Sequence, residues 1–423
     1  MPAHPETTAP GRPESRLAAL RADLSDLFGS DARLFAFTKR ASWALVPLSL
    51  AIVVVVFGTG PEPRRNWYGD MLGNDFSQVW VAGRAALDGR GGEPYDLPVH
   101  LENLKAAFGP ECRFAWHYPP VFLLPAAAVA TLEPQPAFLL WTALSLAVFA
   151  LAMRAAAGRR DAACIALAHP LVFCNLSYGQ NGLFTAALMT FGGLLVDRRP
   201  WFAGLCFGLL VYKPQFAALA PLLLLITGRW NCLAACLATI LALCLASLAL
   251  FGTAPWIGFF GTLGETNRII LQKAAAGLEL NASAFGAVRL LGGSMAAAWA
   301  AQAVVAVLAV GFACRAWLMP TGPDLRAASL LAAAPLLSPY VPVYDLAPLV
   351  PATLLLALVA HRSGGLSAHE RGLLCATPLF ALLREGAGLT GLSGGLLMSL
   401  ATLGCVAYRV RPWPLTALRR AAA

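Results

Sequence analysis

Asp75 is the residue of this sequence best suited to acid–base chemistry. It lies in Gly73-Asn74-Asp75-Phe76, at the start of a polar segment that interrupts a strongly apolar chain. A single carboxylate at a lipid interface can act as a general base, taking a proton from a hydroxyl group as that group attacks. Asp75 could instead be a solvated loop carboxylate or the N-cap of a helix beginning at Phe76. Together with Asp70 it could also hold a divalent cation, and the sequence leaves these alternatives open.

Further polar side chains interrupt later apolar runs, where an unpaired charge beside hydrocarbon is costly and therefore indicates function. Lys213 could hold a phosphate as a point charge, or it could reach from a helix end to the lipid headgroups. Gln180 and Asn181 offer amide groups to sugar hydroxyls, and Asn181 could instead cap the following helix. The other polar candidates near the ends of apolar runs are His117, Tyr118, Gln215, Tyr340, Tyr344 and Asp345.

Three of these candidates have an equally ordinary structural explanation. His117 could orient a phosphate or transfer a proton, but a histidine beside aromatic and proline residues also serves packing at an interface. Tyr340 and Tyr344 suit the aromatic belt at a membrane surface as well as they suit a binding site. Asp345 is harder to explain in this way, because it lies within an apolar stretch that runs to Leu358.

The composition excludes an ordinary soluble protein. Of the 423 residues, 58% are hydrophobic and 13% are charged, which is too little charge to cover a water-exposed surface. The formal net charge of +9 comes from small basic clusters at the ends of apolar runs. Such clusters are typical of membrane topology and not of a nucleic-acid interface. The ten cysteines contain no CxxC pair, so neither a metal site nor a structural disulfide is predicted.

The topology follows from the basic clusters. Residues 1–40 form a polar N-terminal segment whose Leu-rich stretch 17–28 has the spacing of an amphipathic surface helix, and residues 411–423 form a basic tail. Basic residues before the first span place both segments in the cytoplasm. A single membrane domain, residues 41–410, lies between them. Its loops 59–117 and 252–292 are then external, and the first of these loops is the candidate catalytic loop.

Apolar windows recur along the membrane domain, each long enough to cross roughly 30 Å of hydrocarbon. Within the external loops, Phe76–Leu87 and 256–276 have the pattern of helices lying along the interface. The segment 121–132 is interpreted as a re-entrant or half-depth element, because a full crossing would invert everything after it. An all-α polytopic membrane protein of about 12 transmembrane helices (range 10–13) is predicted. The predicted spans cover residues 43–58, 136–153, 162–176, 183–196, 201–211, 216–227, 232–251, 295–313, 327–337, 343–360, 373–383 and 396–408.

In this orientation the polar candidates all lie at or near the external ends of their spans, and we expect them to meet in one cavity. Together their motifs resemble those of glycosyltransferase family 87, a group of GT-C type membrane enzymes similar to polyprenol-phosphate-mannose-dependent mannosyltransferases. The matching pieces follow family order: Asp75-Phe76 with Trp80 and Ala82, Gly89, Pro94-Tyr95-Asp96, Tyr118-Pro119-Pro120 with Pro125, Gly179-Gln180-Asn181, Arg199-Pro200 with Ala203-Gly204, Lys213-Pro214-Gln215, and Ser338-Pro339-Tyr340 with Tyr344-Asp345.

The resemblance implies a GT-C type bundle and an inverting sugar transfer on the external face of a bacterial plasma membrane. Its donor is a sugar on a polyprenyl phosphate, with mannose as the default, and its acceptor is a lipid or glycan. Asp75 then corresponds to the catalytic base, and Lys213, with His117 and Arg268, to the contacts of the donor phosphate. The sugar and acceptor contacts would be Gln180, Asn181, Tyr118, Gln215, Tyr340, Tyr344 and Asp345.

The resemblance also bears on cofactors. Asn74 stands where many GT-C enzymes have the first member of an acidic pair, which weakens a metal-dependent reaction. We therefore expect no metal and no organic cofactor, although a divalent cation is not ruled out by the residues themselves.

Two other functions compete with the transferase. A transporter or lipid flippase would use broken helices and membrane charges equally well, but it predicts repeats between the two halves, and none is visible. A non-catalytic membrane subunit would tolerate the loss of Asp75 without any loss of activity.

Overall fold

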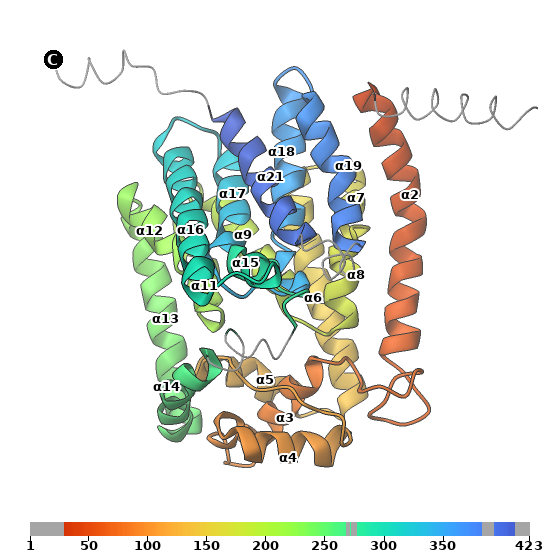
Figure 1. Cartoon of the computed structure of the whole chain (residues 1–423), viewed down its shortest axis with the longest axis vertical. Coiled ribbons are helices and arrows are strands. Elements are labelled where there is room, and N and C mark those ends of the chain that lie inside the picture. The colour runs from red at the N-terminus through yellow and green to blue at the C-terminus, as the bar shows by residue number, and fades with distance from the viewer. Residues whose placement is uncertain (1–28, 268–270, 272–276, 383–392, 411–423) are drawn as a thin grey trace, which may run out of the picture.

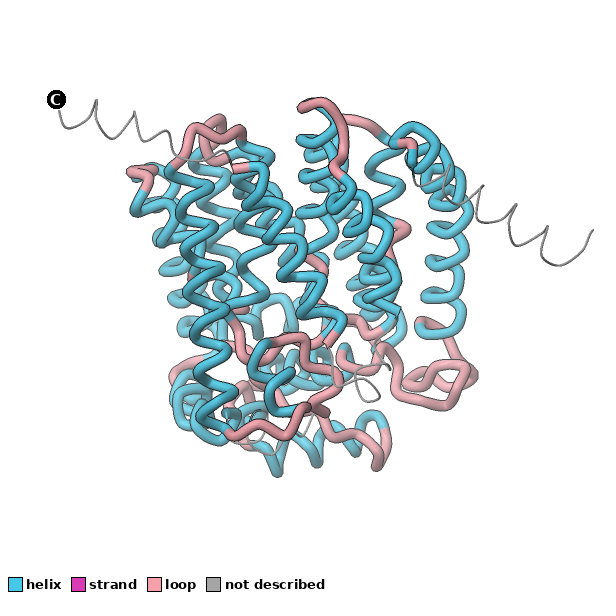
Figure 2. Tube along the Cα trace, turned by 45° about the horizontal axis from the view of Figure 1, so that its top comes forward, coloured by secondary structure: helices cyan, strands magenta, loops and turns pink. Residues whose placement is uncertain are grey.

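The computed structural model describes residues 29–267, 271, 277–382 and 393–410, and their regular structure is helical (Figure 2). Within these residues the β structure is limited to two isolated bridges, between Arg65 and Met71 and between Asn281 and Pro342. The all-α prediction is therefore confirmed for the described chain. The predicted surface helix 17–28, the candidate Arg268 and the tail 411–423 lie outside the described residues.

Five helices of the described chain are long and apolar enough to cross a membrane, and four of them match predicted spans closely. The first, α2, was predicted to begin at residue 43 but begins at Asp31. It starts earlier because Ser30 caps the helix and Asp31 stands in its first turn. The prediction of about 12 spans stays a prediction, since the other helices are shorter. The five are α2 (Asp31–Ile52) with the π-helical turn η1 (Val53–Phe57), α6 (Pro134–Ala157), α13 (Trp230–Phe251), α16 (Met295–Leu318), and η7 (Val343–Leu346) with α18 (Leu349–Arg362).

Prolines divide several of the predicted spans into two helices. The predicted span 162–176 is broken at His169-Pro170 into α7 (Arg160–Leu167) and α8 (Pro170–Ser177), because the residue before a proline is forced out of the helical conformation. Lys213-Pro214 makes a similar break, which falls between the predicted spans 201–211 and 216–227. The elements around these breaks are α9 (Gly182–Leu195), α10 (Pro200–Leu209), η4 (Leu210–Tyr212), α11 (Pro214–Ala217), α12 (Leu219–Ile226), α17 (Pro323–Ala333), η6 (Ala334–Leu337), α19 (Ala368–Leu382) and α21 (Gly394–Arg409).

A layer of short helices covers one end of the bundle, at the bottom of Figure 1. The predicted helix Phe76–Leu87 is confirmed as α3 with the same bounds. It does not lie along the interface with one face open, as expected, because α3 is buried on nearly all sides, packed against its neighbours α4 and α5. The layer comprises α3 (Phe76–Leu87), η2 (Glu93–Tyr95), α4 (Leu97–Phe108), η3 (Pro120–Phe122), α5 (Leu123–Val129) and α14 (Ala254–Asn267), with α15 (Ala284–Leu290) nearer the bundle.

The segment interpreted as re-entrant is the pair η3 and α5, which together run from Pro120 to Val129 and are too short to cross hydrocarbon. At its centre the bundle is held by close helix contacts. α9 packs against α6, α10 and α17, and Gly193 lets α17 approach so closely that a Cβ atom there would lie 2.8 Å from the Ala327 side chain. Small residues at such crossings are typical of helix packing in membranes.

Candidate active site

Asp75 is carried into the bundle by a left-handed turn. Gly73 has φ 61° and Asn74 has φ 47°, a conformation that glycine and asparagine adopt most readily. The Asp75 side chain is only 7% exposed, so it is not a solvated loop carboxylate. It does not cap α3 either, since its side chain makes no bond to the first turn of that helix. Both structural alternatives to a functional role are therefore wrong.

A chain of hydrogen bonds joins Asp75 to three other candidates. Gln180 Nε2 donates to Asp75 Oδ2 at 2.8 Å, and Tyr118 donates its hydroxyl proton to Gln180 Oε1 at 3.2 Å. Asn181 Nδ2 in turn donates to the Tyr118 hydroxyl at 2.9 Å. Asn181 therefore does not cap α9 with its side chain, as one alternative had it. The chain fixes the Gln180 amide with its NH₂ group toward the carboxylate.

Two glycines allow the turn before Asp75 to meet the turn before Gln180. A Cβ atom on Gly179 would lie 2.5 Å from Phe76 Cβ, and one on Gly73 would lie 2.5 Å from the Phe138 ring. Both glycines also have positive φ, which residues with a side chain rarely adopt. A side chain at either position would therefore be disfavoured by the close contact and by the backbone conformation. Trp141 of α6 closes the contact by donating its indole N–H to the Gly179 carbonyl at 2.9 Å. These contacts position the Asp75–Gln180 pair.

Lys213 forms a buried ion pair with Asp345. The two side chains are 4% and 6% exposed, so Lys213 does not extend to the lipid headgroups as the structural alternative required. Lys213 lies in the break between η4 and α11, and Asp345 lies in the short helical turn η7. Each break exposes backbone and aims a charge inward, which an uninterrupted membrane helix would not do.

The ion pair lies close to the Asp75 carboxylate. Both Lys213 and Asp345 act electrostatically on Asp75, and a hydrogen bond from Tyr344 stabilises its charged form. Tyr340 is near enough to feel the charges of both Asp75 and Asp345. The structure thus brings together eight of the eleven predicted site residues: Asp75, Tyr118, Gln180, Asn181, Lys213, Tyr340, Tyr344 and Asp345.

Three predicted site residues lie elsewhere or are not described. Gln215 is exposed, two residues beyond Lys213. His117 lies near His100 of α4, close enough for its charge to lower the pKa of His100. Arg268 lies outside the described residues.

Burial raises the pKa of Asp75 above the ordinary value, and the Gln180 hydrogen bond opposes this rise. A raised pKa brings a carboxylate nearer to the range that suits a general base at neutral pH. At the same time Asp75 keeps a fixed orientation, because Gln180 occupies one of its oxygens.

Replacing Gln180 by alanine is expected to move the acid limb of the kcat/KM profile to higher pH. Gln180 lowers the pKa of Asp75, so its loss raises that pKa, and a base that must be deprotonated then needs a higher pH. We also expect about a tenfold lower plateau, because a hydrogen bond to a charged group is lost. Rates measured from pH 5 to pH 9 would test this, with Gln215→Ala as the exposed control. An unchanged acid limb would contradict the expectation.

His100, which is buried, and His117, which is partly buried, form a second polar feature beside the layer of short helices. Burial lowers the pKa of each to about 4, and the charge of His117 contributes to the shift at His100. His100 is 1% exposed and its Nε2 atom has no hydrogen-bond partner in the described structure. Both histidines are therefore neutral at pH 7, and protonating either would place a charge in an apolar setting.

This pair predicts acid-labile folding. Between pH 6.5 and pH 4 the unfolded chain binds protons that the folded chain does not, so stability falls as the pH falls, by up to about 1.4 kcal/mol per pH unit for each histidine. His100→Phe is expected to reduce the loss of thermal stability between pH 7 and pH 5, because it removes one titrating group and an unpaired nitrogen. Melting curves in detergent at both pH values would test this. The same pH-induced loss in the variant and wild type would contradict it.

Sequence reasoning overlooked two residues that position the site. Asn175 of α8 is fully buried, and with its amide turned to suit its neighbours it donates to the Gln180 carbonyl at 2.8 Å and accepts from the Gly182 N–H at 3.0 Å. Asn281 donates to the Pro339 carbonyl at 2.9 Å and accepts from the Val341 N–H at 3.0 Å, which anchors the segment before Tyr344. An amide within or beside an apolar run was the available signal for both.

Among the residues that the structure describes, no three His, Cys, Asp or Glu side chains are grouped as metal ligands would be. A metal-independent reaction stays a prediction. The geometry itself offers one buried carboxylate with a fixed orientation, one buried cation a short distance away, and several amide and phenol groups around them. Such a set can deprotonate a hydroxyl and stabilise a leaving anion.

A comparison with protein families decides the class to which this arrangement belongs. Residues 116–339, more than half of the chain, match the family model described as Glycosyltransferase family 87. The chain belongs to glycosyltransferase family 87. It is therefore a glycosyltransferase with membrane helices, as the resemblance of its motifs indicated. No curated protein and no solved structure matches the chain significantly.

The family 87 match covers Tyr118, Gln180, Asn181 and Lys213, but it begins after Asp75 and ends before Asp345. The structure connects the parts. Gln180, inside the matched range, holds the Asp75 carboxylate, and Lys213, also inside it, pairs with Asp345. The two acidic residues outside the match are thus bonded to residues within it.

Proposed function

We propose that this family 87 member transfers a sugar, mannose by default, from a polyprenyl-phosphate-linked donor to a lipid or glycan acceptor. The transfer takes place on the external face of a bacterial plasma membrane, and it inverts the anomeric centre. The observation that carries the proposal is the buried Asp75 carboxylate, held by Gln180 and lying near the Lys213–Asp345 pair. A polar cluster of this kind in an apolar bundle is costly to maintain unless it is used.

The reaction is a single displacement. Asp75 takes the proton from an acceptor hydroxyl while the hydroxyl oxygen forms a bond to the anomeric carbon of the donor sugar. The bond between that carbon and the phosphate oxygen breaks, and its electron pair stays on the polyprenyl phosphate. Because attack and departure occur on opposite sides of the carbon, the configuration inverts. Asp75 then returns its proton to the solvent.

Lys213 supplies the positive charge that the leaving phosphate needs. Its ammonium group has three donors, and Asp345 takes up only part of that capacity. The pair is buried, so its field acts in a medium that screens it weakly. A fixed cation placed before the reaction starts stabilises the developing phosphate charge without reorganisation.

The external orientation is supported by the distribution of basic residues. Arg229 directly precedes α13, Arg371 lies in the first turn of α19, and Arg409 ends α21. These three helix ends lie opposite the layer of short helices (Figure 1), and the three arginines form ion pairs with acidic partners. The positive-inside rule assigns that end to the cytoplasm. Asp75 directly precedes α3, which lies at the other end (Figure 1).

The proposal is tested by incubating purified protein with radiolabelled polyprenyl-phosphate mannose and a bacterial membrane lipid extract. Transfer of label to an extract component, with the opposite anomeric configuration from the donor, is the expected result. Radiolabelled nucleotide sugars serve as the matched control and should give no product. Transfer from the nucleotide sugar alone, or no transfer from any polyprenyl-phosphate sugar, would contradict the proposal.

A further inference from the structure

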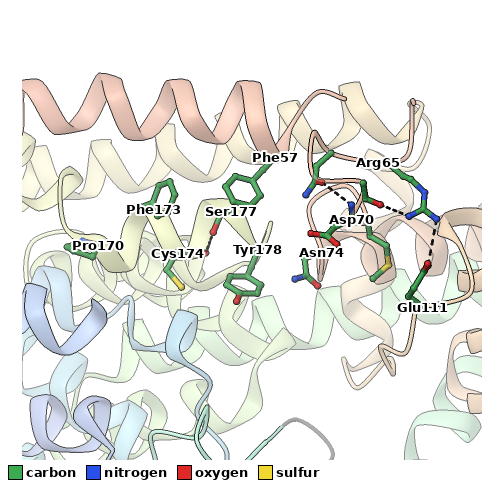
Figure 3. Close-up of a pocket in the computed structure, with 13 residues that line it drawn as sticks. Phe57, Arg65, Asp70, Asn74, Glu111, Pro170, Phe173, Cys174, Ser177 and Tyr178 are labelled. Atoms are coloured by element: carbon green, nitrogen blue, oxygen red, sulfur yellow. Dashed lines mark hydrogen bonds and ion pairs between the residues drawn. The ribbon is translucent and has the colours of Figure 1, made fainter. Parts of the chain in front are cut away.

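A cleft of about 590 Å³ opens beside the candidate active site, between the loop that follows η1 and the helix α8 (Figure 3). Its volume lies within the range of about 300–1,000 Å³ that is common for ligand pockets. The cleft does not contain Asp75, although the neighbouring Asn74 forms part of its wall. The lining residues that matter here are Phe57, Arg65, Asp70, Asn74, Phe173 and Tyr178.

The two sides of the cleft differ in chemistry. Arg65, Asp70 and Asn74 lie on one side, and Phe57 and Phe173, whose rings contact each other edge to face at 6.3 Å, lie on the other (Figure 3). A ligand that fills the cleft must therefore be polar on one part and apolar on another.

The charges of the cleft favour a neutral polar group over an anion. Arg65 is already engaged by the Gly69 carbonyl and pairs with Glu111 at 3.6 Å. The cleft is lined by two carboxylates, Asp70 and Glu111, and by one cation, Arg65, so its net charge is negative. A phosphate would meet net negative charge here, whereas the hydroxyls of an uncharged saccharide would find acceptors.

The cleft lies at the depth where a membrane lipid presents its headgroup. Phe57 is the last residue of the candidate span α2–η1, and the adjacent Trp67 and Tyr68 are 60% and 71% exposed. Exposed tryptophan and tyrosine side chains mark the boundary between hydrocarbon and water. A lipid chain lying in the bilayer can therefore accompany a headgroup placed in the cleft.

The cleft adjoins the residues around Asp75. Asn74 directly precedes the base, and Tyr178 packs its ring 5.9 Å from the ring of Tyr344. Tyr344 is the residue that stabilises the charged form of Asp75 by a hydrogen bond. A group bound along Asn74 and Tyr178 thus lies beside the residues that flank and contact the Asp75 carboxylate.

We propose that this cleft binds the acceptor, and that the acceptor is an uncharged saccharide attached to a membrane lipid. The saccharide lies against Asp70 and Asn74, its lipid chain lies along Phe57 and Phe173, and its free hydroxyl points past Tyr178 toward Asp75. This inference rests on the proposed transferase function and specifies its acceptor. The donor phosphate lies at Lys213, outside the cleft.

The test uses octyl mannoside as the acceptor probe and radiolabelled polyprenyl-phosphate mannose as the donor, with full-length purified protein. Asp70→Ala removes an exposed side chain from the polar side of the cleft, and Phe57→Ala removes a ring from its apolar side. Each variant is expected to raise the KM for octyl mannoside at least fivefold, with the donor KM and the slow release of mannose to water unchanged. Glu102→Ala, an exposed carboxylate of α4, is the control.

The outcomes separate the two proposals. If the wild type transfers mannose but both variants keep its acceptor KM, the cleft assignment is wrong and the transferase function stands. A raised donor KM or a changed release to water would place the donor in the cleft and also overturn the assignment. If the wild type transfers no mannose to any acceptor, both proposals fail together.

Discussion

Replacing Asp75 by asparagine is expected to lower sugar transfer by about 10²–10⁴-fold, the contribution typical of a positioned general base. Asparagine has the size of aspartate and can still bond to Gln180, so the hydrogen-bonded chain should keep its shape, while no group remains to accept the hydroxyl proton. Donor binding should change little, because the donor phosphate is assigned to Lys213. Initial rates at saturating donor and acceptor, together with donor binding by filtration, would measure both quantities.

The matched control is Glu102→Gln, which neutralises an exposed carboxylate on α4, in the same loop between α2 and α6 as Asp75. It should retain wild-type rates, because Glu102 is solvated and lies outside the hydrogen-bonded chain. Equal rates for Asp75→Asn and wild type would remove Asp75 as the base. That result would support the non-catalytic subunit that the sequence left as an alternative.

The sequence predicted the helical elements well because two strong signals act together. Runs of apolar residues must form helices in a bilayer, and proline and glycine punctuate them. For α3 the predicted bounds coincide with those of the structure, and most of the other helices differ by a few residues. The prediction was wrong where it treated one apolar run as a single helix and the structure has two shorter ones. His169-Pro170 divides an apparently continuous apolar run, and a local proline signal does not state whether the helix will bend or end.

The site illustrates a different limit. The sequence identifies costly polar residues, so Asp75, Gln180, Lys213 and Asp345 could each be singled out as candidates. It does not state which of them are partners. Lys213 and Asp345 are 132 residues apart in the chain and form a buried ion pair only because η4 and η7 end at the same place in the bundle. Residue type reveals the cost of a buried group, whereas tertiary structure determines what compensates for it.

Three explanations that treated polar residues as isolated also failed for a common reason. Asp75 and Asn181 both precede helices and so fit capping patterns, yet neither side chain caps. Lys213 stands at a helix end and so fits snorkelling, yet it is buried. The capping and snorkelling patterns are both defined within a single helix and take no account of the segments packed against it. In the folded chain another segment offers a stronger partner, and the side chain turns toward it.

Breaking the Lys213–Asp345 pair is expected to have the largest effect on stability of any single change in the site. Lys213→Met leaves a buried carboxylate unpaired, and Asp345→Asn leaves a buried ammonium unpaired, each at a cost of about 3–5 kcal/mol. The double variant Lys213→Met/Asp345→Asn should lose less than the sum of the two, since no buried charge then remains. Thermal unfolding in detergent, compared over the four proteins of this cycle, measures the coupling.

Activity separates the structural role of the pair from its chemical role. The double variant should be folded and yet inactive, because it lacks the cation for the leaving phosphate.

The two single variants should also differ in the direction in which the acid limb of their pH–rate profile moves. Lys213 lowers the pKa of Asp75 and Asp345 raises it, so the acid limb should move to higher pH in Lys213→Met and to lower pH in Asp345→Asn. Lys39→Met, which breaks the partly exposed pair with Asp161, is the control and should cost at most about 1 kcal/mol. Full transfer activity in the folded double variant would show that the pair only stabilises the fold, and the leaving phosphate would then need another cation.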